Sequence, residues 1–236
     1  MLVAAAVCPC PPLLVPEVAA GAAPELDAAR AACADAVGVL AASRPDLLVV
    51  VGPADEAGLG VHHAGAAGSF DGFGVDLGVR LGSGRAAQER TLPYSLTVGA
   101  WLLGRAHWAA SPVEGLGVAE DMEPRLALAA GRETGARAAR VAVLAMGDGS
   151  ARRSLKAPGY LDERAEDFDA LAVRALAEAD TDALAALDAP LAYELKAAGR
   201  ASWQVLAGAA EDAGLAGRLL YDDAPYGVGY AVAAWS

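Results

Sequence analysis

Lysine, histidine and cysteine are all scarce in this sequence of 236 residues, and acidic residues outnumber basic ones. Lysine occurs only as Lys156 and Lys196. In total, 18 lysines and arginines face 30 aspartates and glutamates, which gives a net charge of −12. No run of basic residues is present. Because nucleic-acid backbones are bound by clustered positive charge, we expect no nucleic-acid partner.

Long apolar runs are also missing. Polar residues or glycines interrupt every apolar stretch well before the roughly 18 residues that a membrane-spanning helix needs. Residues 2–8 are apolar, but no basic residue precedes them and Pro9 ends the run. They therefore predict a buried strand rather than a signal peptide. Three cysteines are too few for a secreted disulfide framework, so we expect a cytoplasmic protein with no membrane partner.

The remaining composition is that of a globular chain, with 55% hydrophobic and 20% charged residues. Short β-branched runs at 46–53 and 140–146 predict buried strands, and the apolar spacing at 24–43 predicts a helix between two of the strands. No linker divides the chain, so we predict a single α/β domain over residues 1–236. The other expected helices are 92–108, 120–138, 162–178, 181–187 and 189–210. The other expected strands are 2–8, 73–81, 112–118, 219–223 and 227–235, with a glycine-rich loop at 58–72.

Ligands of parallel α/β sheets bind outside the carboxyl ends of the strands, and this rule selects a few polar residues. The candidate catalytic residues after three predicted strands are Cys10, Asp55, Asp148 and Ser150. Cys8 and Cys10 have the spacing of a two-thiolate chelate. Alternatively, Cys8 belongs to the core and Cys10 is an inert thiol.

The three histidines allow similar alternatives. His62 and His63 lie in the predicted glycine-rich loop, where they are either metal ligands or a general base, or simply solvated. His107, between Ala106 and Trp108, is expected to be a packing residue of an apolar helix. The Gly147–Ser150 turn lacks the Lys-Ser/Thr pair of a phosphate-binding loop, so a nucleotide ligand is disfavoured.

Three stretches together carry a family resemblance. They are Ala-Ala-Val-Cys-Pro-Cys-Pro-Pro at 5–12, Gly-Asp-Gly-Ser at 147–150, and Asp-Ala-Pro-Tyr-Gly-Val-Gly-Tyr at 223–230. In this order the chain resembles the catalytic B-subunit family of class III extradiol ring-cleavage dioxygenases. The resemblance implies a mixed, mostly parallel central sheet with helices on both faces. It also implies a non-haem Fe(II) held by two histidines and one carboxylate.

The positions that the resemblance assigns to those ligands hold other residues here. The two ligand histidines fall on Cys10 and Ala54, the acidic ligand falls on Ala197, and the acid/base histidine falls on Ala151. An alanine methyl neither coordinates a metal nor moves a proton. The sequence therefore predicts a degenerate site, in which Fe(II) is implied by the family but its ligands are largely replaced.

Three functions remain open from the sequence. The first is a family member without the usual iron site, with either no cofactor or a different one, that binds a small molecule, for example an aromatic one, or a partner protein. The second is a metal-dependent oxidoreductase for a small phenolic compound, with a rebuilt metal centre of Cys10, Asp55 or Glu56, and Glu194. The third is a metal-free enzyme with Cys10 as nucleophile, which neighbouring carboxylates disfavour because they raise a thiol's pKa. Apolar surfaces at 92–108 and Trp235 also suggest a homodimer.

Overall fold

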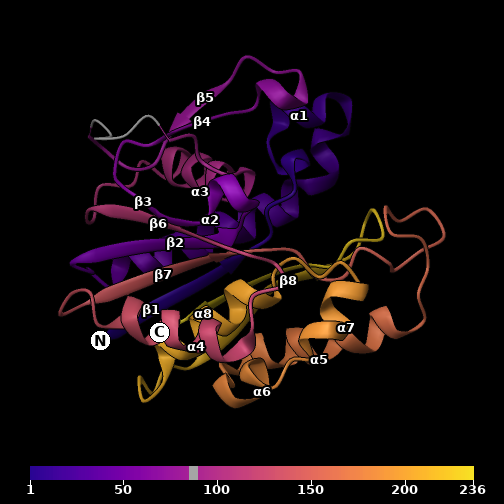
Figure 1. Cartoon of the computed structure of the whole chain (residues 1–236). Coiled ribbons are helices and arrows are strands. Elements are labelled where there is room, and N and C mark those ends of the chain that lie inside the picture. Colours follow the sequence, from indigo (N-terminus) through magenta and orange to yellow (C-terminus); the bar gives the residue numbers. More distant parts are fainter. Residues whose placement is uncertain (85–89) are drawn as a thin grey trace.

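The computed structural model describes residues 1–84 and 90–236, and its centre is a seven-stranded sheet (Figure 1). The strand order is β3-β6-β2-β7-β1-β9-β8. Their bounds are β1 Leu2–Cys8, β2 Leu47–Pro53, β3 Gly60–His62, β6 Val113–Val118, β7 Val141–Met146, β8 Gly217–Asp223 and β9 Tyr230–Trp235. A separate two-stranded sheet pairs β4 Ala67–Ser69 with β5 Gly78–Arg80.

The four strands β6, β2, β7 and β1 are parallel, and antiparallel strands flank them on both sides. Nearly every side chain of β1, β2 and β7 is buried, which explains their continuous apolar sequence: a parallel sheet is covered on both faces. All four parallel strands end at the same edge. The predicted mixed, mostly parallel α/β fold is confirmed.

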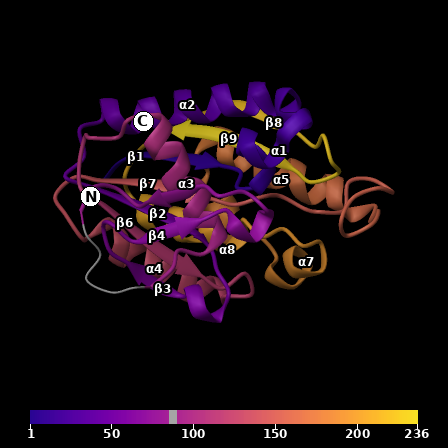
Figure 2. The ribbon, with the colours of Figure 1, turned by 90° about the horizontal axis from the view of Figure 1, so that it is seen from above.

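Helices cover both faces of this sheet (Figures 1 and 2). One face packs against α2 Asp27–Ala42 and α3 Tyr94–Arg105. The other packs against α5 Arg164–Glu178, α6 Thr181–Ala185, α7 Ala189–Glu194 and α8 Arg200–Ala210, with α4 Pro124–Gly135 beside α8. Alternate residues of a strand serve opposite faces: Ala4 and Ala6 join the first core, whereas Ala5 and Val7 join the second. The remaining short elements are α1 Pro16–Ala19 and the 3-10 turns Pro12–Leu14, Ala20–Leu26, Glu56–Gly58 and Asp71–Phe73.

Helices α4 and α8 touch at two glycines. A Cβ on Gly131 would lie 2.1 Å from the Val205 carbonyl oxygen, and one on Gly208 would lie 2.1 Å from the Leu128 carbonyl oxygen. The two backbones are therefore in direct contact, which is possible only without side chains at the crossing. This contact anchors α8 beneath the sheet, with its amino-terminal end at the edge where the parallel strands end.

Several predicted elements differ from those in the structure. The expected loop 58–72 contains β3 and β4, and the expected strand 73–81 is reduced to β5 after a turn at Asp71–Phe73. The expected helix 189–210 is two helices. Lys196 between them is left-handed, with φ +57°, and Gly199 has no room for a side chain against Trp203. Alanine-rich composition concealed this break.

The apolar segments considered for a dimer surface are internal. Residues 95–103 of α3 are buried, and Trp235 is 0% exposed, with its indole N–H donated to the Leu176 carbonyl. Those surfaces are therefore not available to a second copy, and that part of the expectation is wrong. Within residues 1–84 and 90–236, no helix combines the length and apolarity that crossing a membrane requires.

Candidate ligand-binding site

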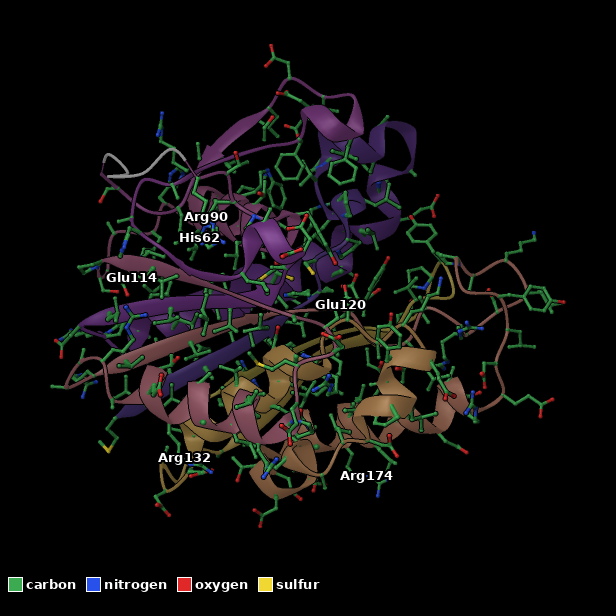
Figure 3. All side chains as sticks on the ribbon, viewed as in Figure 1. His62, Arg90, Glu114, Glu120, Arg132 and Arg174 are labelled. Atoms are coloured by element: carbon green, nitrogen blue, oxygen red, sulfur yellow. The ribbon has the colours of Figure 1, made fainter. Side chains whose placement is uncertain are left out.

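A cleft of about 520 Å³ opens at the edge where the parallel strands end. Its walls come from the residues after β2 and β6, the first turn of α3, and one residue of α7. The lining residues are Ala54, Asp55, Glu56, Leu59, Pro93, Tyr94, Ala119, Glu120, Asp121 and Tyr193. Figure 3 labels Glu120 at this edge. The cleft is where the strand-end rule places a ligand.

The ends of β1 and β7 are joined beside this cleft. The backbone N–H of Cys10 donates a hydrogen bond to Asp148 Oδ1 at 2.7 Å. The prolines around Cys10 prevent a helix from forming here. The Cys10 N–H therefore has no helical partner and can donate to a residue distant in sequence. Gly147 is required next to Asp148, because a Cβ there would lie 2.3 Å from Gly199 Cα. The sequence-predicted pair Cys10 and Asp148 is thus brought together.

Tyr94 connects this pair to the cleft. Its hydroxyl lies beside the fully buried Cys10 thiol, while 39% of the tyrosine stays exposed along the cleft wall. Burial raises the pKa of the Cys10 thiol, and the charges of Asp148 and Glu120 raise that pKa further. The pKa of Tyr94 is also raised, first by the neighbouring Cys10 and then by burial. Both groups keep their protons near neutral pH, so Cys10 is poorly suited to act as a thiolate nucleophile.

Asp148 is the group here that titrates near neutrality. Burial raises its pKa to about 7, and the charge of Glu120 adds to the rise, although the Cys10 amide opposes it. Burial also raises the pKa of Glu120 itself. The Asp148 carboxyl therefore exchanges a proton at physiological pH, which is the property of a general acid or base.

The carboxylates of the cleft are held by their own backbone turns. Asp55 caps the turn at 56–58, where its Oδ1 accepts a hydrogen bond from the Gly58 N–H at 3.0 Å. Glu120 and Asp121 lie in the turn after β6, and the buried Arg200 of α8 fixes that turn. Its guanidinium donates to the Glu120 and Met122 carbonyls, each at 2.5 Å. The amino-terminal end of α8 thus positions one wall of the cleft.

Ser150 belongs to a buried structural network rather than to the cleft. Its hydroxyl donates to Asp169 Oδ2 and its backbone N–H donates to Asp169 Oδ1, both at 2.7 Å. Arg153 contacts the same carboxylate at 3.3 Å. Ser150 is 0% exposed, so no substrate reaches its hydroxyl in this conformation.

The residues do not fit the two-histidine, one-carboxylate iron site of the resembled family. Ala54 lines the cleft where a ligand histidine is expected, and Ala197 is buried. Among the residues that the structure describes, no three His, Cys, Asp or Glu side chains are grouped to hold a metal ion. Glu194, assigned to a rebuilt centre, is instead paired with Arg164 at 2.8 Å.

The histidines lie elsewhere than expected. His62 is buried in β3, where Nε2 donates to the Gly58 carbonyl at 2.8 Å, and burial lowers its pKa. Figure 3 shows it beside Arg90. His107 is exposed just past the end of α3 with φ +49°. Of the alternatives for His62, the solvated one is ruled out by its burial, and the prediction of a packed His107 is wrong; His63 is exposed.

Sequence reasoning missed most of the cleft. Glu120 and Asp121 directly follow a strand that was predicted, so the strand-end rule applied to 112–118 would have found them. The only sequence signal for Tyr94 is a predicted helix start near Pro93, and that signal is weak. No signal marked Tyr193, because the predicted helix 189–210 joined α7 and α8 into one. Asp169 lies inside a predicted helix, 162–178, where the strand-end rule does not apply.

Comparison with known proteins gives the fold and nothing further. No protein-family model matches the chain, and no curated protein matches it in sequence. The chain is similar in structure to an uncharacterized protein, JW3007, from Escherichia coli K12, with a TM-score of 0.56 and 13% identity over 99% of both chains. At that identity the likeness supports the α/β architecture alone.

Proposed function

We propose that this chain binds a small aromatic molecule, neutral or positively charged, in the cleft after β2 and β6, without the iron site of the extradiol dioxygenase B-subunit family that it resembles. The observation that carries the proposal is the lining of the cleft. Tyr94, Pro93 and Tyr193 supply flat apolar surface, and Asp55, Glu56, Glu120 and Asp121 supply negative charge. Aromatic faces together with carboxylates favour cations and disfavour anions.

The size of the cleft agrees with this ligand class. Small-molecule sites usually enclose about 300–1,000 Å³, and this cleft holds about 520 Å³. A single aromatic ring with a short substituent fills it only in part. The Tyr94 hydroxyl, which lies beside the Cys10 thiol, keeps its proton. It can donate a hydrogen bond to a hydroxyl group of the ligand or accept one from it.

The rebuilt metal centre is the less favoured function. It requires Cys10, Asp55 or Glu56, and Glu194 around one ion, but the Cys10 thiol is buried against Tyr94 and Glu194 is paired with Arg164. Both groups would have to leave these partners. A metal-free binding site needs no such rearrangement.

Isothermal titration with benzylamine, catechol and benzoate tests the proposal. We expect benzylamine to bind most tightly, then catechol, with benzoate weakest because the lining carboxylates repel it. Tyr193→Ala should weaken benzylamine binding at least fivefold. Tyr160→Ala is the matched control, because Tyr160 is similarly exposed (63% against 66%) and does not line the cleft.

Two results would overturn the proposal. One is failure of all three probes to bind. The other is stoichiometric iron in protein purified without chelator, together with ring opening of catechol, which would restore the dioxygenase function. Tighter benzoate than benzylamine binding would contradict the charge argument.

A further inference from the structure

A second cleft of about 610 Å³ adjoins the first, and the two share Glu120 and Tyr193 in their walls. Its other lining residues are Arg152, Glu194, Lys196 and Ala198. The first cleft has four carboxylates and no basic residue in its lining, whereas the lining of the second combines two carboxylates, Glu120 and Glu194, with two basic side chains. Both basic side chains of the combined groove therefore lie at one end, and the other end carries only carboxylates as charged groups.

The charge of Arg152 is shared in part with Asp162, whose pKa it helps to lower. Glu194, the carboxylate nearest in sequence to Lys196, is engaged by Arg164 at 2.8 Å. In the described part of the chain Arg152 has no salt bridge, and its buried Nε has no hydrogen-bond partner. A guanidinium left in this state is suited to a carboxylate, which it binds in a planar, two-pronged geometry.

The backbone places both cations at this end. The stem of Arg152 lies over Gly159, where a Cβ would be 2.7 Å from Arg152 Cγ. Lys196 is held in the left-handed region at φ +57°, in the break between α7 and α8. A lysine in this conformation is uncommon because its Cβ crowds the backbone, and glycine or asparagine would fit better.

We infer that the groove takes a zwitterionic molecule whose two charges are separated by an aromatic ring or a spacer of similar length. Its cation lies among Asp55, Glu56 and Asp121, and its carboxylate lies between Arg152 and Lys196. This inference rests on the proposed function and names the ligand class of the same site.

Titration with 4-(aminomethyl)benzoate tests the inference, with benzylamine and benzoate as single-charge probes. We expect the zwitterion to bind at least tenfold more tightly than either. The double substitution Arg152→Gln with Lys196→Gln should abolish this preference, so that the zwitterion binds the variant no more tightly than benzylamine binds the same variant. Raised salt should reduce the zwitterion's advantage, because partly exposed charges are screened.

Lys156→Gln with Arg174→Gln is the matched control. It removes the same two charges from an acidic protein, at residues that line neither cleft. Figure 3 shows Arg174 on α5, apart from Glu120. The control should keep the full preference for the zwitterion.

The outcomes separate the two proposals. If benzylamine binds in a Tyr193-dependent way and the zwitterion binds no more tightly, the inference fails and the proposed function stands. If the preference survives Arg152→Gln with Lys196→Gln in a folded protein, the inference fails as well. If no probe binds, both fail. Circular dichroism and unfolding midpoints establish that each variant is folded.

Discussion

The backbone N–H of Cys10 reaches Asp148 Oδ1 at 2.7 Å, so the residues after β1 and β7 are joined by a single charge-sensitive hydrogen bond. Because Asp148 is largely buried and titrates near neutrality, the state of this bond follows pH in the physiological range. The edge of the sheet that carries the cleft is therefore coupled to a proton equilibrium.

The first prediction concerns Asp148→Asn. The folded pKa of Asp148 is raised from 3.8 to about 7. Its ionisation therefore costs folding free energy that is absent below the unfolded pKa and grows as pH rises toward 7. Asparagine keeps an acceptor oxygen for Cys10 and has no such cost. Between pH 5.5 and pH 8, the variant should gain about 2 kcal/mol of unfolding free energy relative to the wild type.

Urea unfolding at the two pH values measures this gain. Asp35→Asn on the exposed face of α2 controls for the loss of one negative charge, and its stability relative to the wild type should change little. Parallel stability curves for Asp148→Asn and the wild type would show that Asp148 is already ionised in the folded protein at pH 5.5.

The second prediction concerns His62. Its Nε2–H bonds Gly58, its Nδ1 has no partner among the described residues, and burial lowers its pKa. The folded protein thus keeps His62 neutral, whereas the unfolded chain takes up a proton below about pH 6.5. Stability contributed by neutral His62 is present above that pH and is lost as pH falls. His62→Gln should therefore lose less stability than the wild type when pH falls through the range in which the unfolded imidazole takes up its proton.

The measurement compares unfolding free energies at pH 7.5 and pH 5.5 for the wild type, His62→Gln and His63→Gln. His63 is the exposed neighbour and serves as the control. The prediction is refuted if the loss of unfolding free energy at pH 5.5 persists in His62→Gln but disappears in His63→Gln, because His63 would then be its cause.

The third prediction separates a structural from a catalytic Ser150. Ser150→Ala removes a hydroxyl donor from the buried Asp169 carboxylate, and an unsatisfied buried acceptor costs about 1–3 kcal/mol. Ser83→Ala, at an exposed serine, should cost under about 0.5 kcal/mol. A double-mutant cycle with Asp169→Asn should show coupling between the two residues. Additive effects in that cycle would contradict the network.

The fourth prediction uses two glycines in different surroundings. Gly131→Ala places a methyl 2.1 Å from the Val205 carbonyl oxygen, so α4 and α8 must separate, at a cost of about 1–3 kcal/mol or more. Gly38→Ala in α2 meets nothing within 4 Å and should stabilise by about 0.5–1 kcal/mol through its higher helix propensity. Thermal unfolding of the two variants measures whether each substitution raises or lowers the stability of the protein. Equal effects would mean that the crossing is looser than the structure shows.

The fold was largely predictable because its buried strands are continuous apolar runs that end at glycine or proline. The runs at 46–53 and 140–146 became β2 and β7 almost residue for residue. Short strands such as β3 and β4 were not predictable, since three residues among glycines carry no periodic pattern. The break between α7 and α8 was hidden because alanine suits both a helix and a tight turn.

The candidate site was predictable only in part. The strand-end rule found Asp55, Glu56 and Asp148 because it depends on local sequence and sheet direction alone. Tyr94, Tyr193, Arg152 and Lys196 reach the groove from loops and helices whose placement depends on tertiary packing. The burial of Ser150 beside Asp169 likewise depends on contact between two segments that are 19 residues apart. No local pattern around either residue predicts that they pair.

Strand β1 lies between β7 and β9, so neither of its neighbours is local in sequence. During synthesis, residues 2–8 are made before residues 141–146 and 230–235, so β1 has no partner strand until those segments follow. An apolar strand with two open edges is prone to associate with other chains during that interval. The yield of native protein in the cell should therefore depend on chaperones that bind the newly made residues 2–8. This dependence should be stronger than the stability of the finished fold alone would predict.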